Sequence, residues 1–404
     1  MTDDFHVLGL TNMRVNEMRE PFERLGRRAT LLTVNPDEGI RAYLSAVLTG
    51  VRCIERRESD AVVVYNGSGL IGVVGALLSQ YHDVSLLIRQ NGDIFRQHRE
   101  KVLELLEDHE WQTLTTFLPF TLLTRVIFGR ADGFVPVTSA LTETIHCQTD
   151  CPPRRIVPAP NPVRVDDYAP PETEVEHSDD EGRTLLTITN LNFRGKYEGV
   201  TELIAGIVPV LRRQPEVEYV IAGDGRYYER LNRYLEANVD EEVRRRIRTP
   251  GFVEDVAPLY WDADVFLYAS YIDGYPNVIL EAQAAGLPIV TNSAYGISEQ
   301  IEDGESGIFV EPSDPAELKR TVSRLLDDPA ERRRLGQNGS DRVRVENDPD
   351  IVASQIYDAV ETIVTGGKDH DSRGDAPPMT DPTVGGQEEQ RERLDTSRSD
   401  ANER

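Results

Sequence analysis

Short apolar runs alternate with amphipathic stretches of helical length over the N-terminal part of the chain. Runs that are apolar on both faces indicate buried strands, and strands that alternate with helices indicate a parallel sheet covered on both faces. The runs that predict strands are "FHVLGL" from Phe5, "ATLLTV" from Ala29, "AVVVY" from Ala61, "VSLLI" from Val84 and "GFVPV" from Gly133. We therefore predict that residues 1–163 form a Rossmann-like α/β domain.

The same alternation begins again after a segment that is rich in proline and acidic residues. This segment contains "YAPPETEVEHSDDEG" and predicts a linker over residues 164–182. The later runs that predict strands are "TLLTIT" from Thr184, "VEYVIA" from Val217, "DVFLY" from Asp264, "PIVT" from Pro288 and "GIFV" from Gly307. Residues 183–349 thus predict a second Rossmann-like domain. Two such domains facing each other across a cleft bind ligands beyond the carboxyl ends of their strands.

The last periodic stretch is "DIVASQIYDAVETIVTG", which predicts a terminal helix over residues 350–366. Its apolar stripe consists of Ile351, Ile356, Ala359 and Ile363. Residues 367–404 contain almost no large apolar side chains. Because such a segment cannot bury enough surface to offset chain entropy, we predict a disordered acidic tail.

The stretch "WQTLTTFLPFTLLTRVIFGRADG" from Trp111 is more apolar than its neighbours. Pro119 predicts a kink in any helix that forms there. One interpretation is an interfacial patch over residues 111–128 that contacts a membrane carrying a lipid acceptor. The other is a buried helix of the N-terminal domain, and the sequence leaves both open.

Charge limits the classes of partner. The 404 residues carry a formal net charge of −26, which repels phosphate backbones, so we expect no nucleic-acid partner. Only four of the 44 basic residues are lysines. An acidic, lysine-poor surface is typical of a halophilic protein, because salt screens the repulsion. GC-rich codon usage would give the same bias toward arginine.

The start of the chain lacks a basic leader followed by a long apolar core, and no run reaches the roughly 18 apolar residues of a membrane span. We therefore expect a cytoplasmic protein. If residues 111–128 do contact a membrane, its position would be peripheral, on the inner face.

Candidate chemistry lies in "YASYIDGYPNVILEAQAAGLPIV", residues 268–290. "DVFLY" predicts a strand, "ASYIDGY" the loop at its carboxyl end, and Pro276 the first turn of a helix over 276–285 that Gly286 ends. The free amides near Pro276, Asn277 and Val278 form an anion site at the positive end of the helix dipole.

Two acids flank that helix start. Asp273 precedes the first turn, and Glu281 lies about 7 Å along the helix, at ~1.5 Å per residue. A carboxylate accepts hydrogen bonds, so it suits hydroxyl groups. A diphosphate on the helix start would have a ribose at one acid and a second sugar at the other, which describes a nucleotide sugar. The alternative for Glu281 is a buried acid paired with an arginine.

The spacing of these acids resembles the Glu-x7-Glu signature of retaining family 4 glycosyltransferases (glycosyl transferases group 1), which have the two-domain GT-B fold. Four further segments are similar to that family in order and spacing. They are "LTITNLNFRGKYEGVTELIAGI" from Leu186, "VIAGDGRYYERL" from Val220, "GFVEDVAPLYWDADVFLYAS" from Gly251 and "AYGISEQIEDGESGIFVEPSDPAEL" from Ala294. The N-terminal half matches loosely, as the resemblance implies for an acceptor-binding domain.

The resemblance implies a role for each matching position. Glu281 would bind the ribose hydroxyls, and Asp273 would lie near the donor sugar and the bond that breaks. Lys196 or Arg194 would neutralise the pyrophosphate, and the loop length leaves that choice open. The turn residue Gly274, with Pro276, Asn277 and Val278, completes the donor-binding set.

The glycines of "GDG", Gly223 and Gly225, would let the backbone turn tightly near the donor. They fit a tight strand-to-helix connection equally well.

Three positions depart from the family pattern. Asp273 stands where glutamate is usual, Asn190 where arginine is usual, and Asn91 where many relatives have a histidine facing the donor. Asn91 can hydrogen-bond a hydroxyl but cannot carry a proton. "LTNMRVNE" also replaces the glycine-rich loop after the first strand.

The resemblance implies a hexosyltransferase-like enzyme that acts without a metal ion or other cofactor. It would move a sugar from a nucleotide diphosphate donor to the hydroxyl of a lipid-linked glycan, polysaccharide or glycolipid, with retention of configuration. The departures keep a catalytically silent binding subunit open. A nucleotide-sugar epimerase or a sugar phosphorylase on the same fold is a further alternative.

Overall fold

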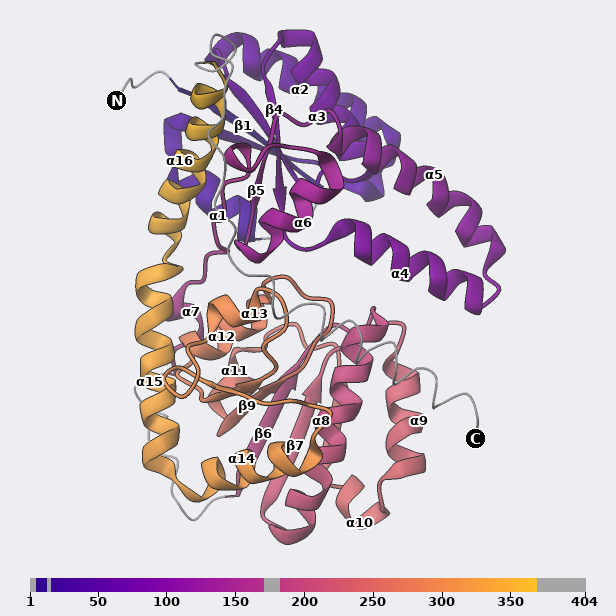
Figure 1. Cartoon of the computed structure of the whole chain (residues 1–404), viewed down its shortest axis with the longest axis vertical. Helices are drawn as coiled ribbons and strands as arrows, with labels where there is room; N and C mark the ends of the chain where they lie inside the picture. The colour runs from indigo at the N-terminus through magenta and orange to yellow at the C-terminus, as the bar shows by residue number, and fades with distance from the viewer. Residues whose placement is uncertain (1–4, 13–15, 171–181, 369–404) are drawn as a thin grey trace, which may run out of the picture. The chain divides into compact units, whose positions relative to one another are not determined.

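Five parallel strands form the first sheet of the computed structural model, in the order β2-β1-β3-β4-β5 (Figure 1). The structure describes residues 5–12, 16–170 and 182–368. Each strand overlaps one of the five runs predicted for this half. Their bounds are β1 Val7–Thr11, β2 Ala29–Thr33, β3 Ala61–Tyr65, β4 Ser85–Gln90 and β5 Gly133–Pro136.

Helices cover both faces of this sheet because neighbouring residues of a strand point to opposite sides. Leu8, Leu10, Val62 and Val64 pack against α2 and α3, whereas Val7 and Val63 pack against α1 and the last helix, α16. The helices of this half are α1 Asn16–Arg24, α2 Ile40–Arg57, α3 Gly69–His82, α4 Ile94–Glu107, α5 Trp111–Phe128, α6 Ala140–Thr149 and α7 Val165–Tyr168, with 3-10 turns at Gly26–Arg28, Pro36–Glu38 and Pro153–Arg155.

A second parallel sheet has six strands in the order β11-β10-β9-β6-β7-β8. Their bounds are β6 Arg183–Ile188, β7 Val217–Ala222, β8 Ile247–Gly251, β9 Val265–Tyr268, β10 Ile289–Thr291 and β11 Ile308–Phe309. The sequence pattern missed β8, "IRTPG". It is an edge strand with charged Arg248 and with Pro250, so it lacks a continuous apolar run.

The helices of the second half are α8 Arg194–Arg213, α9 Tyr228–Asn238, α10 Glu241–Arg244, α11 Ala257–Trp261, α12 Asn277–Ala284, α13 Ile297–Gln300, α14 Pro315–Asp327 and α15 Pro329–Glu346. This sheet has two hydrophobic cores. One lies between the sheet and α8, α9 and α14, and the other lies between the sheet and α11, α12 and α13. The two predicted sheets are therefore confirmed, and the fold class is α/β.

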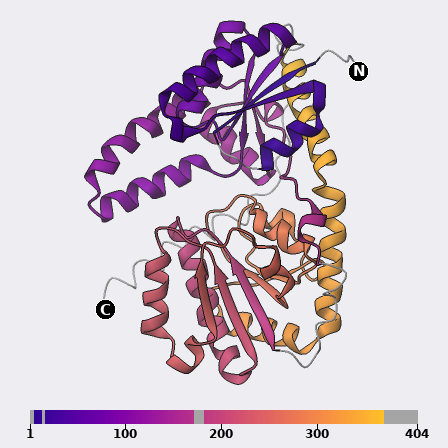
Figure 2. The same ribbon diagram turned by 180° about the vertical axis from the view of Figure 1, so that it is seen from behind.

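The last helix, α16 Pro349–Lys368, returns to the first sheet, as two opposite views show (Figures 1 and 2). Its Val352, Ile356 and Val360 are buried against that sheet, whereas Ile351, which the predicted stripe included, is 40% exposed. Both sheets belong to one compact unit, Met1–Thr365. The domain boundaries stay predictions. Most of the predicted linker and tail (171–181 and 369–404) lies outside the described residues.

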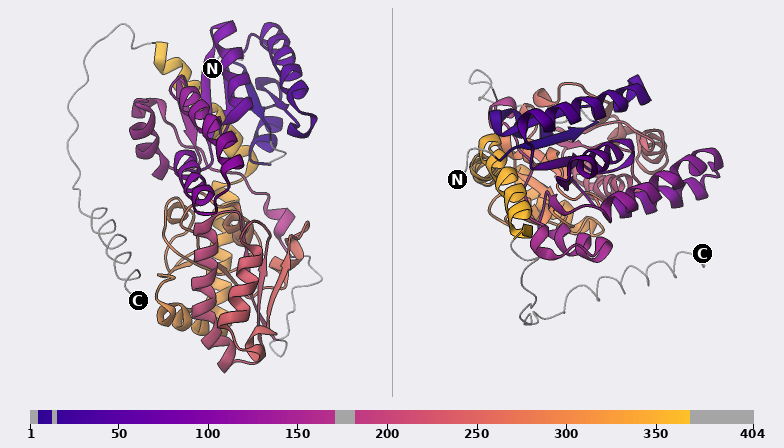
Figure 3. Two further views of the ribbon diagram at one scale, coloured as in Figure 1. Left: turned by 90° about the vertical axis from the view of Figure 1, so that its right-hand side faces the viewer. Right: turned by 90° about the horizontal axis from the view of Figure 1, so that it is seen from above.

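Helices α4 and α5 form a hairpin that extends away from the first sheet (Figures 1 and 3). Helix α5 continues through Pro119 and is only half-buried, with Leu114, Ile127 and Phe128 inside and Leu122 exposed. It is therefore neither a fully buried helix nor a span, and no helix in the described part of the chain is long and apolar enough to cross a membrane.

His98 of α4 is buried in this hairpin against Phe117 and Phe120, with ring centroids 5.3 and 5.5 Å away. Burial lowers the pKa of His98 from 6.5 to about 4. Between these values the unfolded chain binds a proton at this histidine that the folded chain does not. His98 therefore stabilises the fold above pH 6.5 and loses this contribution as the pH falls toward 4.

We expect His98→Leu to reduce the acid-induced fall in melting temperature. Thermal unfolding at pH 5 and pH 8 measures this, with exposed His109→Asn as the control because asparagine tolerates the left-handed backbone at that position (φ 58°). An equal fall in wild type and His98→Leu would contradict the assignment.

Candidate functional site

A lysine and an aspartate form the centre of the candidate site. Lys196 lies in the first turn of α8, after β6, and Asp273 lies in the loop after β9. Because β6 and β9 are adjacent parallel strands, these loops meet at one edge of the sheet. Lys196 Nζ lies 3.0 Å from Asp273 Oδ1, and the lysine side chain is 7% exposed. A solvated surface lysine is thereby excluded.

Asp273 is held from several directions. The Tyr268 hydroxyl, at the end of β9, donates to Asp273 Oδ2. The Ser270 hydroxyl oxygen accepts from the backbone N–H of Ile272 and of Asp273, each at 3.3 Å. The side chain of Asn292 in turn bonds both backbone groups of Ser270. The carboxylate is therefore preorganised, with one oxygen facing the only described cation that pairs with it.

Arg194, the other basic candidate, lies elsewhere. Its guanidinium pairs with Glu198 at 2.8 Å and with Glu107 of α4 at 3.3 Å, and its side chain is half exposed. The structure thus brings Lys196 to Asp273 and leaves Arg194 at the surface. The sequence could not separate the two because both belong to the first turn of the same helix.

The helix with the second acid begins one residue later than the pattern predicted. Pro276 is the N-cap in an extended conformation (φ −69°, ψ 125°), and α12 spans Asn277–Ala284. Gly286 ends it with a φ of 76°. The backbone N–H groups of Asn277 and Val278 form no hydrogen bond with another described residue. They are thus available to an anion.

Glu281 lies beside two tyrosines. Tyr260 of α11 donates to Glu281 Oε2 at 2.8 Å, and the hydroxyl of Tyr168 of α7 is near enough to lower the pKa of Glu281. Burial raises the pKa of Glu281, the two hydroxyls oppose this rise, and the charge of Glu17 adds to it. Within the described residues Glu281 has no arginine partner, in contrast to the alternative that the sequence left open.

A chain of amides joins α12 to the first sheet. Asn161 Nδ2 donates to Asn91 Oδ1 at 2.7 Å and to Asn277 Oδ1 at 2.9 Å. Asn277 in turn donates to Glu17 of α1. The side-chain amides of Asn277 and Asn91 therefore take part in hydrogen bonds that connect the two halves. The backbone N–H of Asn277 is left to bind a ligand.

The turn at Gly274 lies directly against the first half of the chain. A Cβ at Gly274 would lie 3.1 Å from Gly92 Cα and 3.2 Å from the Asn91 carbonyl oxygen. A side chain at this position would require the neighbouring loop to shift by a few tenths of an ångström. The loop that carries Asp273 therefore lies against the loop after β4.

The glycines of the Gly-Asp-Gly turn are explained by packing. Gly223 and Gly225 have φ values of 136° and 145°, which favour glycine. A Cβ at Gly223 would lie 1.7 Å from the Thr189 carbonyl oxygen. The tight connection is thus sufficient to require Gly223. Contact of either glycine with a donor stays a prediction.

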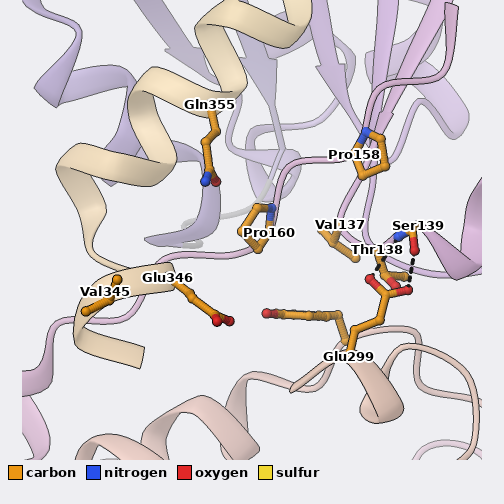
Figure 4. Close-up of a pocket in the computed structure, with 10 residues that line it drawn as sticks. Val137, Thr138, Ser139, Pro158, Pro160, Glu299, Val345, Glu346 and Gln355 are labelled. Carbon is orange, nitrogen blue, oxygen red and sulfur yellow. Dashed lines mark hydrogen bonds between the residues drawn. The ribbon is translucent and has the colours of Figure 1, made fainter. Parts of the chain in front are cut away.

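A cavity of about 350 Å³ is lined by residues other than Lys196 and Asp273 (Figure 4). Its walls include Val137, Pro160 and Gln355, with Glu299 at one side. Glu299 accepts from the Ser139 N–H at 3.0 Å and from the Ser139 hydroxyl and the Ala140 N–H at 2.8 Å. Burial alone would raise the pKa of Glu299, but these hydrogen bonds lower it. Glu299 therefore caps α6 across the two halves.

Sequence reasoning missed the residues around the two acids and around the start of α12. Tyr268, Tyr260, Tyr168, Asn161 and Glu17 come from five separate segments. Of these, only Tyr268 could have been predicted from the sequence, because it places a hydroxyl at the end of an apolar strand, close to Asp273. The others become neighbours only through the topology.

The arrangement suits an anionic ligand with hydroxyl groups on both sides. Lys196 and the free amides of α12 supply positive charge at one edge of the sheet. Asp273 and Glu281 supply acceptors for hydroxyls before and within the helix. The raised pKa of Glu281 and the buried ion pair are features that cluster at functional sites.

Comparisons with known proteins show what the chain is similar to. Residues 182–328 match the family model described as Glycosyl transferases group 1. The chain is 29% identical to a D-inositol 3-phosphate glycosyltransferase of Corynebacterium kroppenstedtii over 53% of this chain and 50% of that protein. It is 31% identical to a glycogen synthase of Mycobacterium tuberculosis over 43% of this chain and 42% of that protein. The chain thus spans about half the length of these curated relatives, or less.

Solved structures show the fold over nearly the whole chain. Anabaena HepE in complex with UDP-glucose matches with a TM-score of 0.67 at 17% identity, over 88% of this chain and 99% of that one. A sucrose-phosphate synthase of Thermosynechococcus elongatus matches with a TM-score of 0.65 at 18% identity, over 89% and 100%. The chain therefore has the GT-B fold, and its residues 182–328 match the glycosyl transferases group 1 family.

Proposed function

We propose that the protein is a glycosyltransferase that moves a sugar from a nucleotide diphosphate sugar to an acceptor hydroxyl. The observation that carries the proposal is the buried Lys196–Asp273 pair beside the free N–H groups at the start of α12. The match of residues 182–328 to the glycosyl transferases group 1 family and the UDP-glucose complex of HepE support the same donor class. UDP-sugars are therefore the first donors to test.

Each residue has a defined part in the proposed reaction. Lys196 and the amides of Asn277 and Val278 bind the diphosphate and stabilise the charge that develops as it leaves. Glu281 accepts from the ribose hydroxyls. Asp273 accepts from hydroxyls of the donor sugar and orients Lys196.

We further propose retention of configuration without a metal ion. The acceptor hydroxyl attacks on the face from which the diphosphate departs, and the departing phosphate takes its proton. The position of Asn91, which cannot titrate, fits a reaction in which no protein side chain on that loop carries the proton. Acceptor binding by the first half, with a lipid-linked glycan, polysaccharide or glycolipid as acceptor, remains part of the proposal.

The test is a screen of UDP- and GDP-sugars against the purified full chain in molar salt. We expect one donor to raise the melting temperature by mass action and to release nucleoside diphosphate slowly, even without acceptor. Nuclear magnetic resonance of the transferred sugar then reports its configuration. Glu281→Ala should abolish the shift, whereas His109→Asn, on the exposed turn before α5, should not.

The outcomes separate the candidate functions. Donor binding without release of nucleotide would identify a silent binding subunit, and a changed sugar on intact donor would identify an epimerase. Absence of any nucleotide-dependent shift would contradict the proposal.

A further inference from the structure

The outer helices of the first half form one layer. Helix α3 packs between α2 and α5 on the same face of the first sheet, and α1 and α16 cover the opposite face. Buried residues such as Ala46, Leu78 and Ile127 fix the inward sides of these three helices. Their remaining sides are therefore turned away from the sheet.

The outward side of α2 carries an apolar stripe. Ile40, Leu44 and Leu48 recur every four residues, which places them on one side of a helix. They are 66%, 59% and 61% exposed. Scattered exposed leucines are normal, but three in one row on a helix indicate a surface that is covered by something else.

The two neighbouring helices continue this surface. Leu70, Leu77 and Tyr81 are exposed on α3, and Leu118, Leu122 and Val126 are exposed on α5. We call these nine residues on α2, α3 and α5 the apolar face. Trp111, exposed at the start of α5, lies at its border. Aromatic residues such as Tyr81 and Trp111 favour the boundary between lipid and water.

The charge of the three helices differs from that of the rest of the chain. The protein has 70 Asp and Glu residues against 44 Lys and Arg, yet helices α2, α3 and α5 together contain one acidic residue, Glu55, and five arginines. These are Arg41, Arg52, Arg56, Arg57 and Arg125, all exposed. The excess of arginine over acid on three helices that share one layer is not explained by the composition.

The nearest acids beyond α5 are already paired. Asp108 and Glu110, in the turn between α4 and α5, both bind Arg226 of the second half, Glu110 at 2.7 Å. Their charge is therefore partly neutralised before any partner approaches. The face presents apolar side chains and positive charge together.

We infer that the apolar face docks the protein on the surface of a lipid bilayer that contains anionic lipids. Apolar side chains enter the boundary between headgroups and acyl chains, and arginines such as Arg41, Arg52 and Arg125 bind the lipid phosphates. A second copy of the chain is a poorer occupant, because a two-fold contact through this face would bring together two surfaces that each carry five arginines and one acid. The inference concerns a surface and does not depend on sugar transfer.

Vesicle flotation of the full chain tests the inference. We expect binding to vesicles of equal parts phosphatidylcholine and phosphatidylglycerol, and much weaker binding to phosphatidylcholine alone. Leu44→Glu with Leu122→Glu should abolish binding, and because both positions are exposed the fold should not change. Replacing Arg41, Arg52 and Arg125 together by Gln should lower partitioning about 100-fold at low salt, and less in molar salt, where attraction is screened.

The control is Phe252→Glu, which adds the same charge at an exposed apolar residue of the second half (76% exposed) and should leave vesicle binding unchanged. Analytical ultracentrifugation of wild type and the double variant accompanies flotation. A dimer that the double variant dissociates, with no vesicle binding, would overturn the inference in favour of self-association. A monomer that binds neither vesicle would overturn it as well, as would equal binding to both.

Discussion

Replacing Lys196 by alanine is expected to lower sugar transfer by about 100- to 1000-fold, the usual effect of removing one group that stabilises developing negative charge. The departing diphosphate would keep only the helix amides, and Asp273 would add uncompensated negative charge beside it. Steady-state release of nucleoside diphosphate measures the change. We expect Arg194→Ala to keep most of the activity, because its guanidinium pairs with Glu198 and Glu107 instead of Asp273.

The same replacement should also destabilise the fold, which must be separated from the loss of chemistry. Removing one partner of a buried ion pair leaves the other charge uncompensated and costs about 3–5 kcal/mol. The double variant Lys196→Met with Asp273→Asn removes both charges and should recover the melting temperature. Its activity should stay low. Recovery of transfer together with stability would show that the pair is structural and would contradict the role of Lys196.

The strands could be predicted because the sheets are parallel and buried. Runs such as "AVVVY" from Ala61 have no polar face, so neither the element nor its place in the core is ambiguous. Strand β8 was not predicted, for the opposite reason: it is an edge strand with Arg248 and Pro250 and has no apolar run. The prediction for Ile351 failed because the next residue, Val352, takes the buried position at the start of α16, which leaves Ile351 on the exposed side of the helix.

The candidate site was predictable only where its residues are close in sequence. Asp273 and Glu281 share one loop and helix, so their spacing indicated opposite sides of a helix start. Whether Lys196 or Arg194 pairs with Asp273 depends on which side of α8 each residue occupies. The sequence pattern does not fix this. Tyr168, which lowers the pKa of Glu281, lies more than a hundred positions before it, and only the topology brings the two near each other.

The affinity of Glu281 for a donor ribose should depend on pH. A ribose hydroxyl donates to a carboxylate, so binding needs the deprotonated acid. Burial raises the pKa of Glu281 above the ordinary value of 4.5, and protonation on acidification therefore begins at a higher pH than for an exposed glutamate. We expect UDP-sugar affinity to fall as the pH decreases through this raised pKa. Calorimetry with an intact UDP-sugar measures it, because a diphosphate diester does not itself titrate there.

Two variants define the origin of this dependence. Glu281→Gln should bind the donor about 10- to 100-fold more weakly, as expected for loss of hydrogen bonds to a charged group, and without the pH dependence. Tyr260→Phe removes a hydroxyl that lowers the pKa of Glu281, so the loss of affinity should begin at a higher pH than in wild type.

Tyr219→Phe is the matched control, because its buried hydroxyl bonds Thr187 at 2.8 Å, away from both acids, and it should leave the pH profile unchanged. Because stability also changes with pH, circular dichroism at each pH confirms that the folded protein is being titrated. A profile that is identical in wild type and Glu281→Gln would mean that another group controls donor binding, and Glu281 would then be a buried acid held by Tyr260 for the fold alone.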